Sequence, residues 1–281
     1  MGKYSGTLLV SDFDRTITAP DGTIPEANLS AVRRFMEEGG RFCVATGRTL
    51  PLFRNKIGLF PFNAPMILFN GAMAYDFNTE SVVFDHPMPK DVVKFCLDIQ
   101  RRFPKMYYEL LLAGRHAVHS CDEPRRRLLV EHDVTMCTLD DILPDEPVYM
   151  GSIIGRYVSP ADTGEDYFAC TDEEEQTIRA ILAHIAERGK GQYSGVRPAK
   201  LLIEYMADGI SKGAAARELA VKLGCSRLAC IGDAMNDLSM LEEADVAFMP
   251  SDGDEELLQR PEFRHCATCS EGAVASAISM L

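Results

Sequence analysis

The stretch Thr7–Thr16 has the sequence TLLVSDFDRT and lies near the N-terminus of this 281-residue chain. Its apolar part, Leu8–Val10, is typical of a short strand that is buried on both faces of a parallel sheet. Asp12 and Asp14 follow with one residue between them, and alternate residues of an extended segment point to the same side. Because open α/β folds bind ligands at the carboxyl edge of the sheet, the stretch predicts two carboxylates directed at one ligand-binding point.

Two carboxylates at this spacing allow two interpretations. Like charges so close together destabilise each other unless a cation or a proton is shared, which indicates a metal site or an acid–base pair. The alternative is a structural turn in which an aspartate side chain closes the end of the strand. The rest of the chain favours the first interpretation, because further acidic residues follow other predicted strands.

Length, composition and charge restrict the class of protein. A chain of 281 residues with 46% hydrophobic residues is expected to form one large domain or two modest ones. A net charge of −13 argues against nucleic acid or an anionic membrane surface as a partner. No apolar run approaches the length that spans a bilayer, and a strand beginning at residue 7 leaves no room for a signal peptide. Nine scattered cysteines indicate reduced thiols, and together these features predict a cytoplasmic protein. A monomer or a homodimer is expected, and the sequence does not distinguish the two.

Strand and helix signals alternate over residues 1–85 and again over 193–281, which predicts an α/β core with a parallel sheet. The regular alternation of strand and helix signals stops over residues 86–192. These residues are expected to form an inserted α+β domain joined to the core by two connections. A strand is expected within this insertion at residues 149–158. The run Leu201–Glu204 is expected to be the first core strand after it.

Polar clusters fall at the ends of predicted strands or at the start of a helix. They are Asp12 with Asp14, Thr46 with Gly47, Lys212, and Asp233 with Asn236 and Asp237. The carboxyl ends of parallel strands meet at one edge, so we expect these residues to gather there. Such an acidic pocket needs a divalent cation, and its oxygen ligands suit Mg²⁺. A phosphate group would fit beside the metal and Lys212, with hydrogen bonds from the Thr46 hydroxyl and the Gly47 amide.

Four segments resemble the four ordered motifs of the haloacid dehalogenase superfamily. They are DFDRT at Asp12–Thr16, ATGR at Ala45–Arg48, GISKG at Gly209–Gly213 and GDAMND at Gly232–Asp237. The large insertion lies between the second and third segments, as in the Cof-like subfamily of sugar-phosphate phosphatases with a C2-type (IIB) cap. Asn70–Ala72 also fits that subfamily. The resemblance implies a Rossmann-like core with an inserted cap.

The resemblance also implies roles for individual residues. Asp12 would be the nucleophile that forms an aspartyl-phosphate, and Asp14 would be the general acid and then the general base. To act as an acid, Asp14 must be protonated at neutral pH, which crowding by Asp12 would favour. Mg²⁺ would be held by Asp12, the Asp14 carbonyl and Asp233, with Asp237 binding a metal-bound water or Lys212. The implied phosphate-binding groups are the Phe13 amide, Thr46, Gly47, Lys212 and Asn236.

We therefore predict a Mg²⁺-dependent phosphatase that hydrolyses a small phosphorylated metabolite such as a sugar phosphate. A phosphomutase of the same superfamily and a non-catalytic phosphometabolite-binding protein are the alternatives. Intact Asp12 and Asp14 favour an enzyme, because binding alone does not need an acid beside a nucleophile.

Several residues outside these roles carry separate expectations. Arg15 stands where the superfamily commonly has glycine, and it is a candidate for substrate contact. Arg115, His116 and His119 share a predicted strand of the insertion and are candidates for lining its substrate side. A structural role without substrate contact is the favoured interpretation. The run Arg125–Arg127 is expected to be a solvated face. Cys266 and Cys269 have the spacing of half a zinc site, but ordinary packing is expected because no second pair accompanies them.

Overall fold

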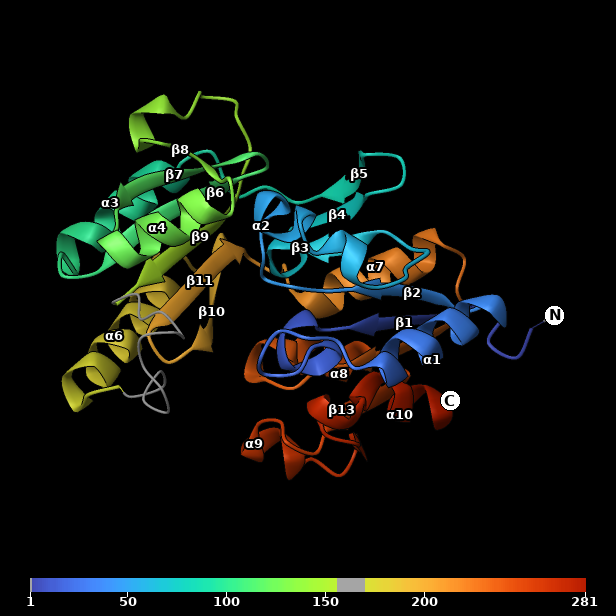
Figure 1. Ribbon diagram of the computed structural model, residues 1–281. Helices are drawn as coiled ribbons and strands as arrows, with labels where there is room; N and C mark the ends of the chain where they lie inside the picture. The colour runs from blue at the N-terminus through green and yellow to red at the C-terminus, as the bar shows by residue number, and fades with distance from the viewer. Residues whose placement is uncertain (1, 156–169) are drawn as a thin grey trace. The chain divides into compact units, whose positions relative to one another are not determined.

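The computed structural model describes residues 2–155 and 170–281 (Figure 1). They separate into two compact units. The core unit comprises Met1–Arg48, Lys56–Asp85 and Ser211–Leu281, and the inserted unit comprises Thr49–Asn55 and His86–Ile210. In the described residues no helix is both long and apolar enough to cross a membrane.

The core unit is built on a five-stranded parallel sheet with the strand order β14-β13-β12-β1-β2. Its strands are β1 (Thr7–Ser11), β2 (Arg41–Val44), β12 (Arg227–Ile231), β13 (Val246–Pro250) and β14 (Arg264–Cys266). The apolar run Leu8–Val10 of the central strand β1 is completely buried, as its sequence predicts. An antiparallel sheet of β3 (Met66–Leu68), β4 (Met73–Asp76) and β5 (Ser81–Asp85) belongs to the same unit.

Helices connect and cover these strands. They are α1 (Glu26–Glu37), α7 (Lys212–Lys222), α8 (Leu238–Glu243), α9 (Glu255–Leu258) and α10 (Ala273–Ser279). The α1 and α10 helices come from opposite ends of the chain but pack side by side in Figure 1, and α7 packs on α8. This parallel α/β arrangement confirms the predicted fold class.

The inserted unit contains a six-stranded sheet with the order β10-β11-β9-β6-β7-β8, antiparallel except for the β7–β8 pair. Its elements are α2 (Leu50–Arg54), α3 (Val92–Arg102), β6 (Tyr107–Leu112), β7 (Arg115–Ser120), α4 (Glu123–Glu131), β8 (Thr135–Cys137), β9 (Val148–Ile154), α6 (Asp172–Arg188), β10 (Tyr193–Ala199) and β11 (Leu202–Ala207). Apolar residues of α3 and α6, among them Ile99 and Ile181, are fully buried in the core of this unit.

The predicted limits of the insertion were wrong at its C-terminal end. The β10 and β11 strands extend the inserted sheet instead of opening the second half of the core, with Leu202 opposite Ile154 of β9. Their fully buried side chains, Ile203 and Tyr205, complete the apolar core of the inserted unit. Of the strand predicted at 149–158, residues 156–158 lie outside the described residues.

A second difference concerns Thr49–Asn55, which belongs to the inserted unit although it precedes the main insertion. Leu52 packs there against the buried residues Leu129 and Val134. The chain therefore passes between the two units at 48/49, 55/56, 85/86 and 210/211, not only at the two connections expected. Leu129 lies 77 positions after Leu52 in the sequence, so no local sequence pattern encodes the packing of this short segment.

Gly71 brings a turn of the core unit against the start of α7. Its φ is +109°, in the left-handed region that favours glycine. A Cβ added at Gly71 would lie 2.2 Å from the carbonyl oxygen of Ser211, the residue immediately before Lys212. The close contact therefore requires glycine both for its backbone conformation and for space.

We expect Gly71→Ala to lower the free energy of unfolding by about 1–3 kcal/mol, because it combines left-handed strain with overpacking against Ser211. Urea unfolding at equilibrium measures the change. Gly58→Ala is the matched control, since a Cβ there meets no atom within 4 Å and its φ is not in the left-handed region. Equal stability of the two variants would contradict this role of Gly71.

Candidate active site

Three neighbouring strands bring their carboxyl ends together in the core unit. Ser11, the last residue of β1, lies opposite Val44 of β2 on one side and Ile231 of β12 on the other. Asp12, Thr46 and Asp233 follow these three strand ends. Parallel pairing thus places the first, second and fourth sequence motifs at one edge of the sheet, as expected for an α/β fold.

Lys212 joins the third motif to the first and fourth. Its Nζ donates to Asp12 Oδ1 at 2.6 Å and to Asp237 Oδ1 at 2.7 Å. The lysine is the first residue of α7, a position set by Ser211, whose side chain accepts a hydrogen bond from the Ala214 amide and caps the helix. Burial alone would lower the pKa of Lys212, but the two carboxylates hold it above the ordinary value, so the ammonium stays charged.

Asp12, Asp233 and Asp237 each offer a carboxylate oxygen, and these atoms lie within 4.8 Å of one another. The Asp233 carboxylate accepts a hydrogen bond from Thr16 Oγ1 at 2.7 Å. Asp237 Oδ2 accepts the backbone N–H groups of Asp233 at 3.1 Å and Ala234 at 3.2 Å. These bonds fix the direction of two of the three carboxylates.

The carboxylates of this cluster are destabilised in their charged form. Burial raises the pKa of Asp12; Lys212 opposes the rise, and Asp237 and Asp233 add to it. Burial and the neighbouring Asp237 raise the pKa of Asp233 to about 7. Three buried carboxylates and one ammonium leave a surplus of negative charge that a divalent cation would neutralise. The donor set therefore fits Mg²⁺, for which carboxylate oxygens are suitable ligands.

Asp14 does not point into this cluster. Both of its oxygens accept hydrogen bonds from Arg48, from Nε at 2.9 Å and Nη2 at 2.8 Å, and its side chain is 54% exposed. Asp14 is paired with a guanidinium in this arrangement, and its role as general acid and then general base stays a prediction.

Arg15 has a backbone φ of +61°, a conformation that non-glycine residues rarely adopt. The turn is held by the Arg15 amide, which donates to Thr18 Oγ1 at 3.1 Å, and by the Thr18 amide, which donates to the Phe13 carbonyl. This conformation explains why glycine suits the position and why arginine there is a departure. The Arg15 side chain is exposed, and its charge opposes the rise in the pKa of Asp233.

The other predicted phosphate-binding residues are sequence neighbours of the aspartate cluster or follow the adjacent strand β2. Thr46 is buried; its amide donates to the Ile67 carbonyl, and its hydroxyl accepts from the Arg48 amide at 3.2 Å. Gly47 follows it, and Asn236 lies in the turn that carries Asp237. Phe13 is buried next to Asp12. Binding of phosphate by these groups stays a prediction.

Three residues that shape this site have no role that the sequence pattern alone predicts. Thr16 orients Asp233, Arg48 holds Asp14, and Gly232 leaves room for Asp237, since a Cβ at Gly232 would lie 2.5 Å from the Asp237 Cβ. All three residues lie inside the motif segments, and this position was the only indication in the sequence that they could contribute to the site. Their partners could not be identified without the fold.

Cys266 and Cys269 are not part of a metal-ligating group in the described residues, where the aspartate cluster is the only such group of three or more side chains. Cys269 is directed instead to Asp252, which accepts a hydrogen bond from the Cys269 amide at 2.9 Å and from its thiol at 3.0 Å.

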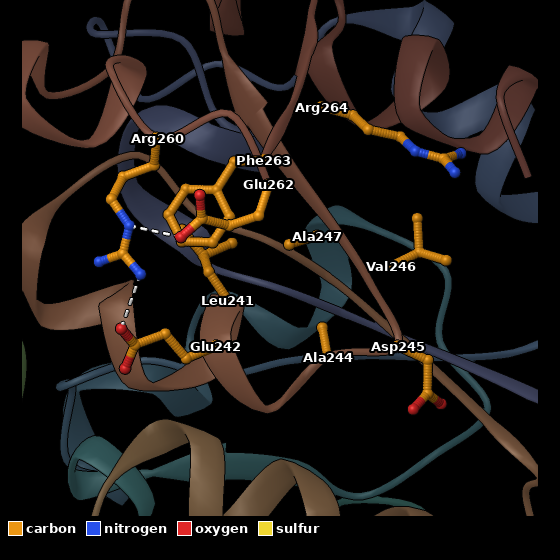
Figure 2. A pocket seen from close by; sticks show the side chains of 10 residues that line it. All are labelled: Leu241, Glu242, Ala244, Asp245, Val246, Ala247, Arg260, Glu262, Phe263 and Arg264. Carbon is orange, nitrogen blue, oxygen red and sulfur yellow. Dashed lines mark hydrogen bonds and ion pairs between the residues drawn. The ribbon is translucent and has the colours of Figure 1, made fainter.

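A pocket at the other ends of the strands is distinct from this site. Figure 2 shows it next to Val246 and Arg264, the first residues of β13 and β14. Arg260 forms ion pairs there with Glu262 at 2.6 Å and with Glu242 at 3.0 Å, drawn as dashed lines. The pocket lies at the start of β13 and β14, whereas the aspartate cluster follows the carboxyl ends of the strands, so the pocket is not the candidate active site.

Comparison with known proteins identifies similar chains over almost the whole length. A family profile described as haloacid dehalogenase-like hydrolase matches residues 9–278. The HMP-PP phosphatase of Escherichia fergusonii is 27% identical over 272 residues, covering 92% of this chain and 90% of the relative. The 5-amino-6-(5-phospho-D-ribitylamino)uracil phosphatase YitU of Bacillus subtilis is 24% identical over 271 residues, covering 95% and 94%.

A similar fold is found in a haloacid dehalogenase-like hydrolase from Bacteroides thetaiotaomicron. Its crystal structure superimposes with a TM-score of 0.76 at 21% identity, covering 99% of each chain. At 21% identity, this structural similarity is evidence for the fold alone.

The raised pKa of Asp233 predicts a stability that depends on pH. The folded protein holds a proton on Asp233 up to a pKa of about 7, whereas the unfolded chain releases it near 3.8, so unfolding becomes easier as pH rises between these values. In EDTA we expect a loss on the order of 4 kcal/mol from this group across the window, to which Asp12 adds in the same direction.

Urea unfolding at several pH values between about 5 and 8 measures this slope. Asp233→Asn should make it shallower, because the variant loses the titration of Asp233 and also the part of the raised pKa of Asp12 that the Asp233 charge causes. Saturating Mg²⁺ should also flatten it, since a cation favours the carboxylates. The same slope in wild type and Asp233→Asn would contradict the assigned shift.

Proposed function

Because the chain belongs to the haloacid dehalogenase-like hydrolases and is a phosphoric monoester hydrolase, we propose that it cleaves a small phosphorylated metabolite by covalent catalysis through Asp12. The observation that carries the proposal is the buried ammonium of Lys212 shared between Asp12 and Asp237. A lysine that binds one Asp12 oxygen fixes the carboxylate in one orientation, which a nucleophile requires.

The reaction proceeds in two displacements. The Asp12 carboxylate attacks phosphorus, and the bond from phosphorus to the leaving oxygen breaks while Asp14 gives that oxygen a proton. Water then attacks the phosphorus of the aspartyl-phosphate, Asp14 accepts a proton from it, and release of phosphate restores Asp12. The two hydrogen bonds from Arg48 hold the Asp14 carboxyl group in one orientation, which both proton transfers require.

The remaining groups bind the phosphate and its charge. Lys212, the Thr46 hydroxyl and the Gly47 amide would donate to the non-bridging oxygens, which carry the charge in the transition state. Asp12, Asp233 and Asp237 are the carboxylates that would hold Mg²⁺, with the Asp14 carbonyl as a further ligand implied by the family resemblance. When bound, Mg²⁺ supplies charge neutralisation at the transferring phosphoryl group.

The substrate that we propose is a sugar phosphate or a similar small phosphate ester. The two relatives are named for different phosphorylated compounds, so the family resemblance alone leaves the choice open. Hydrolysis of a panel of phosphorylated metabolites by purified protein tests the class. A phosphomutase would instead return the phosphoryl group to a second position of the sugar without releasing phosphate.

We expect Asp12→Asn to reduce turnover by at least about a thousandfold, because the amide keeps the size of the side chain but removes the attacking charge. Release of inorganic phosphate from para-nitrophenyl phosphate measures the loss. Asp21→Asn is a suitable control, since Asp21 is an exposed residue that closes a turn with Thr23. One tenth of wild-type activity in Asp12→Asn would rule out the covalent mechanism.

Activity should depend on a divalent cation, since three buried carboxylates otherwise repel each other and the phosphate. Excess EDTA should abolish phosphate release and Mg²⁺ should restore it. Ca²⁺ should substitute poorly, because its looser coordination would misplace the Asp12 carboxylate. Undiminished activity in EDTA would show that the carboxylate cluster is not a metal site.

A further inference from the structure

Several arginines of this chain are paired with carboxylates. In the inserted unit, Arg125 on α4 donates to both oxygens of Glu109, from Nε and Nη2 at 2.7 Å each. Glu109 and His116 are completely buried, and His116 Nδ1 lies 3.3 Å from Glu109 Oε2. The expectation that Arg125 lies on a solvated face was therefore wrong, and His116 is held in a buried structural contact.

Arg15 in the core unit differs from these arginines, although it directly follows Asp14. The other two cations of the candidate site are paired, since Arg48 is bonded to Asp14 and Lys212 to two carboxylates of the cluster. The Arg15 side chain is exposed, and among the described residues its guanidinium has no hydrogen-bond or ion-pair partner. A cation beside the site is therefore available to a ligand.

The backbone of Arg15 is fixed in an unfavourable conformation. Its φ of +61° and ψ of 13° lie in the left-handed region, which residues with a Cβ rarely adopt. The Arg15 amide donates to Thr18 Oγ1 at 3.1 Å, and that hydroxyl donates to the Phe13 carbonyl at 3.1 Å. Thr18 is buried, so the turn is held from inside the core unit. Residues in such conformations cluster at functional sites, which makes a functional role for this arginine a specific hypothesis.

The guanidinium of Arg15 lies close enough to the aspartate cluster to act on it electrostatically. Its positive charge opposes the rise in the pKa of Asp233, one of the three clustered carboxylates. The preceding residue, Asp14, is the proposed acid that protonates the leaving oxygen. The part of the substrate that leaves with this oxygen is therefore next to the turn that carries Arg15.

We propose that Arg15 is a specificity-determining residue, which binds a second anionic group on the part of the substrate that leaves with the ester oxygen. The inference rests on the proposed function, since that function places the leaving oxygen at Asp14. The substrate class is a small phosphate ester that also carries a carboxylate or a second phosphate. A guanidinium suits either group, because its planar set of N–H donors matches two oxygens of a carboxylate or a phosphate.

Two other roles of Arg15 would give a different result. Contact with the reacting phosphate, or neutralisation of Asp233, would affect the hydrolysis of every phosphate ester to the same extent. Binding of a second anionic group affects only the esters that carry one. Substrates that differ in this group alone therefore distinguish the proposal from both other roles.

Matched pairs of substrates test the proposal in saturating Mg²⁺. Glycerol 3-phosphate and 3-phosphoglycerate share one carbon skeleton, and only the second has a carboxylate. Fructose 6-phosphate and fructose 1,6-bisphosphate differ by one phosphate. In at least one pair, kcat/KM of the wild-type protein should be about tenfold higher for the more anionic member, as expected for one charged hydrogen-bonded contact. The pair that shows the preference distinguishes a carboxylate from a phosphate.

Arg15→Gln removes the charge and keeps a polar side chain. It should abolish the preference by raising KM for the more anionic member about tenfold, with kcat changed less than about twofold, because a contact remote from the reacting bond is lost. Arg15→Gly suits the left-handed backbone, so it guards against misfolding of the glutamine variant, and it should show the same loss. Arg15→Lys keeps the charge and should retain part of the preference.

Arg33→Gln is the matched control, since Arg33 is an exposed arginine of the core unit and its loss changes the net charge equally. This control should leave the preference unchanged. An equal loss of activity toward both members of a pair in Arg15→Gln would overturn the proposal, as would an equal change of preference in Arg33→Gln. A wild-type protein that prefers the more anionic member of neither pair would overturn it as well.

Binding without turnover separates this inference from the proposed function. In Mg²⁺, calorimetric titration of Asp12→Asn with the same compounds should show about tenfold tighter binding of the more anionic member, and the double variant Asp12→Asn/Arg15→Gln should bind both members equally. A wild-type protein that hydrolyses no phosphorylated compound contradicts the proposed function, and these affinities then decide by themselves whether Arg15 binds the second anionic group. Equal affinities for both members of each pair in Asp12→Asn would overturn the inference.

Discussion

The candidate site depends on one buried ammonium. Lys212 is 1% exposed and bonds to Asp12 and Asp237, which follow different strands and lie 225 positions apart in sequence. A buried charge is stable only with partners of opposite charge, so these three residues have to be placed together. The parallel sheet meets this requirement by directing β1 and β12 to the same edge, and α7 begins where its first side chain reaches both carboxylates.

Close backbone approach is the second condition for this arrangement. Gly71 lets a turn touch the residue before Lys212, and Gly232 leaves space for Asp237. Arg15 differs from these glycines, because it is a residue with a side chain in a left-handed conformation that glycine would adopt without strain. The backbone around the site is therefore shaped by two glycines and one unfavourable arginine.

The sequence predicted the α/β core because its strands are short apolar runs, each followed by a polar motif at the sheet edge. It did not predict the end of the insertion, because Leu201–Glu204 looks like a core strand and only its pairing with β9 shows otherwise. The buried pair of Glu109 and Arg125 was also missed, since three successive arginines usually indicate a solvated face. Likewise, the bond between Asp14 and Arg48 depends on a side-chain direction that spacing cannot encode.

The proposed mechanism requires Asp12 to receive the phosphoryl group, and trapping that group tests the requirement most directly. Acid quenching during hydrolysis in Mg²⁺, followed by peptide mass spectrometry, should find one added phosphoryl group on the peptide that contains Asp12. Borohydride reduction of the quenched protein should convert residue 12 to homoserine, because the acyl phosphate is reducible. A phosphoryl group on any other residue, with Asp12 unmodified, would contradict the account.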